Sequence, residues 1–339
     1  MNKFNLLDCT LRDGGYITEW EFGNDVIINI TKGLVEANLD FVEVGYLNNK
    51  PYKDGSAIFN NIEQIESFLP KDRKNSIILA MADVSQFLPE NLTPFTGTSI
   101  DGIRVVFYKH QIEEALVMCK AVQEKGYKLF VQPMVTIDYD VNEYMHLAER
   151  IAQLHPFAVS IVDSFGYMTK SDVRKYYRIL DNVLSPEVII GYHSHNNMDL
   201  AFITAQDMLD YQTARQLVLD SSLYGMGRGA GNLHTELIAN YYNTLFGERF
   251  DIKKIISILS RYIMPIRAEK DWGYSPYMFL TGYYHAHPNF ATYLLELHPD
   301  VTVEQFEQFV YQIPKEMMTK CRKPYVEQLY QEVIGKSIK

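Results

Sequence analysis

The sequence predicts a (β/α)8 barrel, the TIM-barrel class of α/β folds, with additional C-terminal helices. Short runs rich in Val, Ile, Leu and Phe alternate with helical patterns from the N-terminus to about residue 250. Eight such runs, each followed by a helix-sized segment, match the units of this fold. Several runs are almost continuously apolar, which is typical of strands covered on both faces by helices. An open doubly wound sheet is the alternative. Its dinucleotide-binding form has no support, because LRDGGY rather than a GxGxxG loop follows the first run.

The predicted elements follow from this alternation. The eight predicted strands are Phe4–Cys9, Phe41–Gly45, Ser76–Met81, Gly102–Phe107, Lys128–Pro133, Ala158–Val162, Val188–His193 and Gln216–Asp220. Apolar spacings of three and four residues predict helices over Asn24–Asn38, Ala57–Phe68, Gln111–Lys125, Asn142–Leu154, Ser171–Val183, Asp199–Tyr211 and Leu233–Phe246. After the third strand, Val84–Leu92 is short and interrupted by proline, so a helix there has the least support. Asn24 and Ser171 are predicted N-caps, and Gly126 is predicted to end its helix.

The sequence after the alternating part predicts only helices. We therefore expect a barrel over residues 1–250 and a C-terminal helical region over residues 251–339. The predicted C-terminal helices are Ile252–Ile263, Ser275–Leu297, Val303–Tyr311 and Val326–Ile334.

The composition is that of a globular protein and excludes several classes. Of 339 residues, 47% are apolar, which is enough for a large core. There are 32 Lys and Arg against 42 Asp and Glu, a net charge of −10 without a long basic stretch, so a nucleic-acid binder is not expected. No apolar run approaches the roughly 20 residues of a membrane span. The 3 cysteines form no CxxC pair and the start has no apolar signal segment, so we expect a reducing, cytoplasmic location.

Polar residues gather where the predicted strands end. In this fold the active site lies at the C-terminal ends of the strands, where the loops that follow them converge. The segments concerned are Thr10–Gly15, Glu43 within the second strand, Asp163–Gly166, His193–Asn197 and Gly225–Asn232. Such a concentration of polar groups at one rim is not favoured by burial alone, so it predicts a functional site.

His193 and His195 are two residues apart on a predicted strand, so both imidazoles project to the same side. Asp13, at the corresponding rim position after the first strand, would complete a metal site of two imidazoles and one carboxylate. The alternative is a polar loop that binds no metal. The ligand set suits Mn²⁺, Zn²⁺, Co²⁺ or Fe²⁺, and Mg²⁺ less well. Open positions on the ion would accept a 2-oxo acid, and its enolate would be stabilised by the ion as a Lewis acid.

Four further residues are candidates for the same site. Arg12, next to Asp13, would hold negative charge that develops on the keto oxygen, or would only form a salt bridge to Glu43. Asn232 ends the loop GMGRGAGN and is either a helix N-cap, a further ligand or a residue that holds the ligands in place. Glu43 is likewise either a further ligand or a residue that holds the ligands in place. Ser164, after the sixth strand, is a candidate for substrate binding.

Taken together, these motifs resemble the metallolyase barrels that include 3-hydroxy-3-methylglutaryl-CoA lyase, isopropylmalate synthase and 4-hydroxy-2-oxovalerate aldolase, with the aldolases most similar. The similar segments are TLRDG from Thr10, HSHNN at 193–197, the region from Val218 through GMGRGAGN, and Gly273-Tyr274. The resemblance implies that Asp13, His193 and His195 bind a divalent ion, usually manganese. It also implies cleavage of a 4-hydroxy-2-oxo acid into pyruvate and an aldehyde, and a partner acylating aldehyde dehydrogenase that receives the aldehyde.

The same resemblance assigns further roles and contains one departure. It implies that Arg12 stabilises the enolate, that Asn232 lies near the metal and that Tyr274 contributes to the active site. The aldolases carry a His three residues after the metal-binding Asp as the acid/base group, and here Tyr16 stands at that position. A free phenol, with a pKa of about 10, is a weaker base at neutral pH than imidazole. Either Tyr16 is activated by the ion and Arg12, or Tyr274, His285 or His287 serves, although the YYHAHPN segment is expected to be loop or surface.

Three functions from different classes remain open from the sequence. The first is a metal-dependent aldolase. The second is a Claisen-type acyltransferase that condenses acetyl-CoA with a 2-oxo acid, for which residues 251–339 are short. The third is a non-catalytic barrel, which only Tyr16 supports. A homodimer is the default expectation for the assembly.

Overall fold

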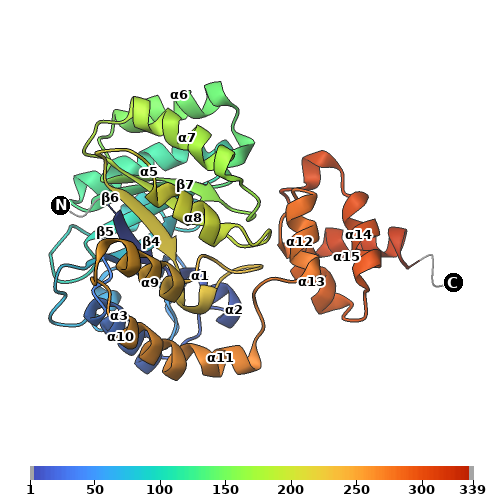
Figure 1. Ribbon diagram of the computed structural model, residues 1–339, viewed down its shortest axis with the longest axis horizontal. Coiled ribbons are helices and arrows are strands. Elements are labelled where there is room, and N and C mark those ends of the chain that lie inside the picture. Colours follow the sequence, from blue (N-terminus) through green and yellow to red (C-terminus); the bar gives the residue numbers. More distant parts are fainter. Residues whose placement is uncertain (1–3, 336–339) are drawn as a thin grey trace.

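A closed barrel of eight parallel strands forms the body of the molecule (Figure 1). The computed structural model describes residues 4–335, so residues 1–3 and 336–339 of the two predicted regions lie outside the described residues. The barrel strands are β1 (Phe4–Asp8), β2 (Phe41–Leu47), β4 (Ile77–Asp83), β5 (Gly102–Phe107), β6 (Lys128–Pro133), β7 (Ala158–Asp163), β8 (Ile189–Ser194) and β9 (Leu217–Ser221). They pair in the order β1-β9-β8-β7-β6-β5-β4-β2, and pairing of β2 with β1 closes the ring. The predicted fold is confirmed.

The segment after β2 differs from the prediction of a helix over residues 57–68. It contains the short strand β3 (Ile58–Phe59) and only one helical turn, α4 (Glu63–Glu66). The cause lies in β2, where Gly45 has φ +148° and the pairing with β4 shifts register. A Cβ atom at Gly45 would lie 1.9 Å from the carbonyl oxygen of Ala57, so glycine lets the two backbones touch. Ile58 then pairs with Tyr46 as a strand instead of starting a helix.

Helices surround the barrel in the predicted positions. They are α3 (Asn24–Glu36), α5 (Ile112–Glu124), α6 (Val141–Ala152), α7 (Lys170–Val183), α8 (Ala201–Leu209) and α9 (Thr235–Phe246). Between β4 and β5 there is only the 3₁₀ turn η1 (Pro89–Asn91), as the proline in that segment suggested. Further 3₁₀ turns are η2 (Lys109–Gln111), η3 (Thr136–Asp138), η4 (Leu223–Gly225) and η6 (Lys315–Met317).

Two of the three predicted helix-end residues are wrong, each by one or two positions in the sequence. Gly23 is the N-cap residue of α3, and Asn24 is its first helical residue. Thr169, not Ser171, caps α7, because its side chain accepts a hydrogen bond from the Asp172 amide while Asp172 bonds back to the Thr169 amide. Gly126 follows α5 with φ +90°, as expected for the residue after a helix.

The barrel core and the core of the C-terminal helices meet later in the chain than residue 250. The helix α10 (Ile252–Ile258) continues through a π-helical turn (Leu259–Ile263) into α11 (Met264–Glu269). The hydrophobic core of the barrel extends to Trp272, and a second core begins at Leu280. This second core belongs to a lobe made of α12 (Pro276–Tyr283), α13 (Asn289–Leu297), α14 (Val303–Tyr311) and α15 (Lys323–Val333), which we call the C-terminal lobe.

A single predicted helix, Ser275–Leu297, is broken into α12 and α13. His285 has φ +57°, which no α-helix accommodates, and Pro288 precedes the first residue of α13. The break places residues 285–288 against the barrel. The ring of His285 stacks on Tyr167 with 4.2 Å between centroids, and Asn197 donates a hydrogen bond to Thr281 (3.0 Å). The C-terminal lobe therefore packs on the loops that follow β7 and β8 (Figure 1).

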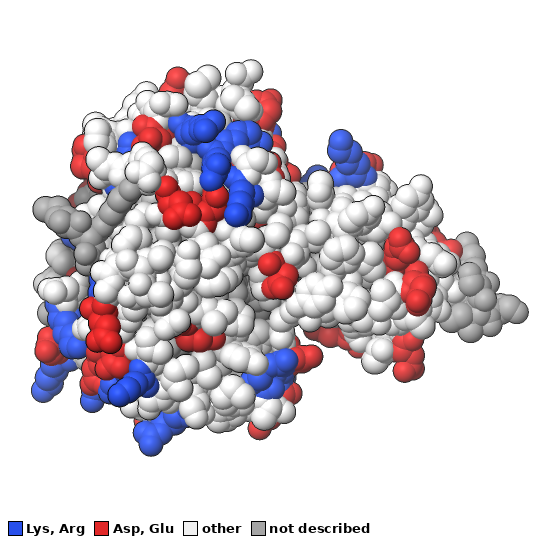
Figure 2. All heavy atoms as spheres, viewed as in Figure 1, with Lys and Arg blue, Asp and Glu red and all other residues white. Residues whose placement is uncertain are grey.

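Charged side chains are unevenly spread over the visible face of the molecule. Figure 2 shows a broad uncharged area at its centre, with acidic and basic groups together toward the edges of the barrel. Within residues 4–335, the helices are all too short or too polar to cross a membrane.

Candidate active site

Asp13 reaches the barrel mouth from a helical turn, not from the end of the strand as predicted. β1 ends at Asp8, and residues 10–13 form the one-turn helix α1 (Thr10–Asp13), followed by α2 (Gly15–Thr18). The amide of Thr10 donates to the carboxylate of Asp8 (2.9 Å), and the amide of Asp13 donates to the carbonyl of Cys9 (2.8 Å). This tight turn sends the Asp13 carboxylate inward, where its side chain is 1% exposed.

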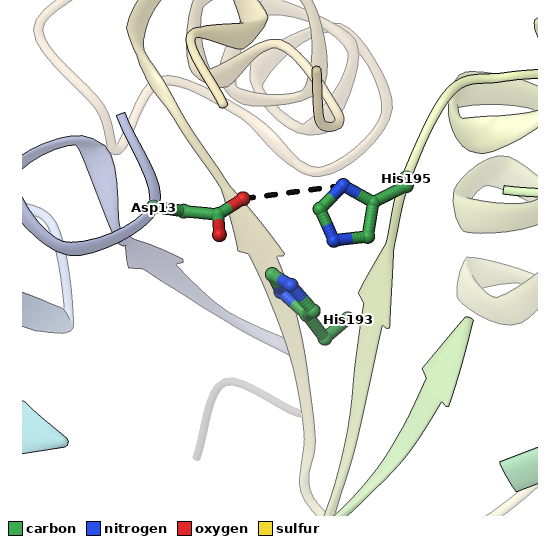
Figure 3. A group of neighbouring side chains, drawn as sticks. All are labelled: Asp13, His193 and His195. Atoms are coloured by element: carbon green, nitrogen blue, oxygen red, sulfur yellow. Dashed lines mark ion pairs between the residues drawn. The ribbon is translucent and has the colours of Figure 1, made fainter. Parts of the chain in front are cut away.

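His193 and His195 lie opposite Asp13, at the end of β8 (Figure 3). One ligand atom from each of Asp13, His193 and His195 lies within 4.8 Å of the other two, and all three residues are buried. The Nδ1 atom of His195 is 4.0 Å from Oδ2 of Asp13. The structure therefore brings together the three side chains that the sequence predicted as metal ligands.

The electrostatics of these groups favour the protonation states of metal ligands. Burial alone raises the pKa of the Asp13 carboxyl, but the nearby positive charge of Arg12 holds that pKa well below its usual range. Burial lowers the pKa of His195 to about 3, so its imidazole is neutral at neutral pH. A carboxylate and a neutral imidazole are the forms that bind a divalent ion.

A divalent ion fits this set of side chains. Among residues 4–335, the buried Nδ1 atom of His195 has no hydrogen-bond partner, which is unusual for a polar atom inside a protein. His193 Nδ1 is 3.1 Å from Asp220 Oδ2, which leaves its Nε2 atom for a ligand. A carboxylate that orients an imidazole in this way is a common support of metal-binding histidines. Cys9, the one thiol nearby, donates instead to the carbonyl of Ser221 (3.2 Å).

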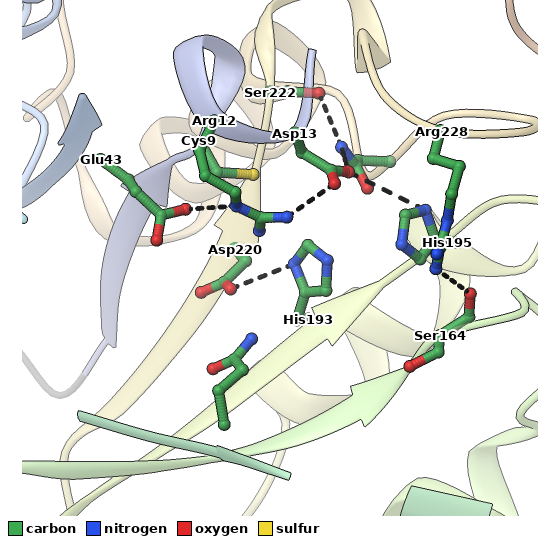
Figure 4. A network of polar contacts seen from close by, with 12 residues as sticks. Cys9, Arg12, Asp13, Glu43, Ser164, His193, His195, Asp220, Ser222 and Arg228 are labelled. Atoms are coloured by element: carbon green, nitrogen blue, oxygen red, sulfur yellow. Dashed lines mark hydrogen bonds and ion pairs between the residues drawn. The ribbon is translucent and has the colours of Figure 1, made fainter. Parts of the chain in front are cut away.

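A buried polar network supports the site from inside the barrel (Figure 4). Arg104, which is 1% exposed, donates to Glu43 (3.0 Å), to Gln132 (2.9 Å) and to Asp220. Burial raises the pKa of Asp220, but the charge of Arg104 and the contact with His193 lower it overall, so this carboxylate stays ionised beside the imidazole. The sequence analysis assigned no role to Arg104, Gln132 or Asp220. The signal was present, because Arg104 is a charged residue within the apolar strand GIRVVF.

Arg12 forms the salt bridge that was one of its two predicted roles. Its Nε donates to Glu43 (2.8 Å) and one terminal nitrogen donates to Asp13 (2.6 Å). The other terminal nitrogen is buried without a partner in the described part of the chain. The guanidinium is thus fixed at two points with one donor left over. Glu43 contacts both Arg12 and Arg104, so it holds Arg12 in place and is not part of the three-residue ligand group.

Asn232 supports Asp13 and does not cap a helix. Its Nδ2 donates to Asp13 Oδ2 (2.6 Å) and to the carbonyl of Met226 (3.2 Å), while His234 is the N-cap residue of α9. The Oδ1 atom of Asn232 is buried without a hydrogen-bond partner within residues 4–335. The loop around it is tight, since a Cβ at Gly227 would lie 2.3 Å from the Asn232 amide.

A small cavity opens beside Asp13, His193 and His195. Its lining includes the predicted residues Tyr16 and Ser164, and also Arg228. Tyr16 is 41% exposed, so its ring stands at the cavity mouth. Tyr274 is 58% exposed and does not line this cavity, so the structure does not bring it to the ligand group.

The two histidines of the YYHAHPN segment have different environments. His285 packs on Tyr167 at the edge of the C-terminal lobe. His287 lies in the loop between α12 and α13, as one of the two expected alternatives, but it is only 7% exposed and its ring lies 5.2 Å from that of Phe165. The amide of Asn289 donates to its Nδ1 (3.1 Å). His287 lines a second cavity, which shares Met134 with the first one.

Comparisons with known proteins agree with this geometry. A family model described as HMGL-like matches residues 3–261. An oxaloacetate decarboxylase of Mycobacterium tuberculosis is 24% identical over 286 residues, which are 82% of each chain. A 4-hydroxy-2-oxovalerate aldolase of Bacillus thuringiensis is 24% identical over 276 residues, 77% of this chain and 76% of the relative. The N-terminal domain of a proposed aldolase from Bacteroides vulgatus superimposes with a TM-score of 0.73 at 25% identity, over 85% of this chain and 95% of that one.

Proposed function

Because this chain belongs to the HMGL-like family and is a lyase, we propose that it is a divalent-metal-dependent aldolase. The proposed reaction cleaves the C3–C4 bond of a 4-hydroxy-2-oxo acid into pyruvate and an aldehyde. The observation that carries the proposal is that Asp13, His193 and His195 meet beside an Arg12 nitrogen that has no hydrogen-bond partner among residues 4–335. Relatives named 4-hydroxy-2-oxovalerate aldolase also support it.

In the proposed mechanism, Asp13, His193 and His195 hold the ion. When bound, the ion supplies Lewis-acid chemistry at the 2-oxo group. The free donor of Arg12 faces negative charge as the electrons of the C3–C4 bond move toward the 2-oxo oxygen. Tyr16, acting as the phenolate, takes the proton of the 4-hydroxyl and returns it to C3, which completes pyruvate and restores Tyr16.

We infer manganese as the resident ion from the family resemblance, and the donor set is compatible with it. Two imidazole nitrogens and one carboxylate oxygen suit Mn²⁺, Co²⁺ and Zn²⁺ better than Mg²⁺, which prefers an all-oxygen shell. A homodimer and a partner acylating aldehyde dehydrogenase remain proposals that follow from the family resemblance alone.

The proposed reaction is tested with 4-hydroxy-2-oxopentanoate and a coupled assay for pyruvate. We expect pyruvate release that stops after dialysis against a chelator and returns with about one equivalent of Mn²⁺. Metal content measured on the same samples gives the stoichiometry. Pyruvate release that continues in the chelated protein would contradict the metal requirement. Thiol release from acetyl-CoA with a 2-oxo acid, without pyruvate formation, would indicate the acyltransferase instead.

The role of Tyr16 is tested by two substitutions at that position. We expect Tyr16→Phe to lower kcat/KM about a hundredfold, because general acid–base groups contribute about 10²–10⁴ to rates. Tyr16→His should retain activity and extend it to lower pH, because imidazole has an ordinary pKa of about 6.5. The measurement is the pH profile of kcat/KM, with Tyr283→Phe as a control at a tyrosine that is 60% exposed on the C-terminal lobe. A hundredfold loss in Tyr274→Phe, with Tyr16→Phe unaffected, would assign the acid/base role to Tyr274.

A further inference from the structure

Arg228 is a cation in the cavity wall for which the proposed reaction has no use. It sits in the loop GMGRGAGN, where Gly227 packs against Asn232 and Gly229 has φ +65°, so the backbone around it is held closely. One terminal nitrogen donates to the carbonyl of Ser164 (3.0 Å), and the guanidinium lies 5.5 Å from the centre of the Tyr16 ring. The Nε atom is buried and has no partner in the part of the chain that the structure describes.

Arg228 is half-buried, and it differs in its partners from the three fully buried arginines. Each of these three forms a salt bridge with at least one carboxylate. Arg12 pairs with Asp13 and Glu43. Arg104 pairs with Glu43 and Asp220, and Arg215 pairs with Asp181. Within residues 4–335, Arg228 forms no salt bridge with any carboxylate, although the charge of Asp13 acts on it from a distance. A guanidinium that is partly shielded from water and lacks a counter-ion has an energetic cost, so a half-buried arginine that lines the cavity points to an anion that binds there.

The charge balance of the site also leaves room for a second anionic group. The three arginines Arg12, Arg104 and Arg228 equal in number the three carboxylates Asp13, Glu43 and Asp220, although these carboxylates form salt bridges only with the first two arginines. A dication held by the ligand group would then leave two positive charges. A 2-oxo monoacid brings one negative charge, whereas a 2-oxo acid with a second carboxylate brings two and neutralises the site.

The positions of the two cavity arginines fit a substrate with two anionic ends. Figure 4 shows Arg12 and Arg228 on opposite sides, with Asp13 and His193 between them. Resting on the proposed aldolase reaction, we propose that the substrate is a 4-hydroxy-2-oxo dicarboxylate and that Arg228 binds its distal carboxylate. Cleavage of C3–C4 then gives pyruvate and an aldehyde that carries the distal carboxylate. The 4-hydroxyl proton passes through the Tyr16 phenolate to C3, and the electrons of the C3–C4 bond move toward the 2-oxo group and return to form the new C3–H bond.

A matched pair of unreactive ligands tests this proposal by binding alone. 2-Oxoglutarate and 2-oxopentanoate have the same chain length and differ only in that a methyl group replaces the distal carboxylate. Neither has the 4-hydroxyl that cleavage needs. We expect isothermal titration of the Mn²⁺-loaded protein to show at least about tenfold tighter binding of 2-oxoglutarate. The reason is that its distal carboxylate accepts charge-assisted hydrogen bonds from Arg228, which a methyl group cannot do. Arg228→Met should remove the difference, and Arg228→Lys should retain part of it.

The controls separate a distal contact from other roles of Arg228. Arg150→Met, which removes a guanidinium from a surface ion pair with Glu113, should leave the ratio of the two affinities unchanged. Equal affinities in the unaltered protein would overturn the proposal even if Arg228→Met fails to fold. An equal weakening of both ligands in Arg228→Met would also overturn it, because Arg228 would then contact the carboxylate that both ligands share.

Activity measurements distinguish this inference from the proposed function. 4-Hydroxy-2-oxoglutarate and 4-hydroxy-2-oxopentanoate form the corresponding pair of substrates. Cleavage of both with equal kcat/KM would keep the aldolase and remove the role of Arg228. Preferential binding of 2-oxoglutarate without cleavage of either substrate would keep the distal carboxylate site and remove the aldolase.

Discussion

Asp13→Asn is expected to abolish stoichiometric Mn²⁺ binding and to lower kcat/KM for pyruvate formation by about a thousandfold. The amide has nearly the same shape but no charge, and it is a poor ligand for a dication. Lewis-acid stabilisation contributes several kcal/mol to such reactions, and about 4 kcal/mol corresponds to a factor of about 10³. Isothermal titration with Mn²⁺ and steady-state kinetics measure the two effects separately.

The control for Asp13→Asn is Asp300→Asn, which makes the same change at an exposed position on the C-terminal lobe. We expect this variant to bind Mn²⁺ and to turn over as the unaltered protein does. If Asp13→Asn bound Mn²⁺ within about twofold of the unaltered affinity, the three-residue ligand group would be wrong. A thermal melt of each variant shows whether the loss reflects the site or the fold, because Asp13 also carries the contacts with Arg12 and Asn232.

Arg12→Lys is expected to lower kcat by about 10²–10³ while Mn²⁺ affinity changes much less. Lysine retains the positive charge beside Asp13 but cannot contact Asp13 and Glu43 and also present a further donor to the substrate. Removing one donor from a developing oxyanion costs about 10²–10³ in kcat. Kinetics at saturating Mn²⁺, together with Mn²⁺ titration, measure the two quantities.

The result for Arg12→Lys decides between its two predicted roles. A loss confined to Mn²⁺ affinity, with kcat recovered at high Mn²⁺, would show that Arg12 only holds Asp13 and Glu43 by salt bridges. The predicted loss of kcat at saturating Mn²⁺ requires a contact with the reacting atoms. The buried terminal nitrogen that lacks a partner among residues 4–335 is the atom available for that contact.

Local patterns were sufficient to predict the fold and to select the three side chains that the structure brings together at the barrel mouth. The alternation of strands and helices predicted each barrel strand to within two residues. His193 and His195 were recognisable because a strand places alternate residues on one side, a property that needs no tertiary information. Asp13 was recognisable from its motif, although the one-turn helix that aims it was not predicted.

Contacts between distant segments were not predictable in the same way. Arg104, Gln132 and Asp220 come from three strands, and only the closed barrel shows that they meet beneath His193. From the sequence, Arg228 was one residue of a glycine-rich loop, and only the structure showed that it has no carboxylate partner within residues 4–335. The resemblance suggested Tyr274 as a site residue, but the structure leaves it outside the cavity.

By itself, the sequence determined which segments become strands and helices and which side chains share a face, because both depend on neighbours within a few residues. Only the tertiary structure decided which charges are paired, where the C-terminal lobe packs and which residues face the cavity. Pairing and burial depend on distances between segments far apart in the chain, and these distances exist only once the barrel has closed.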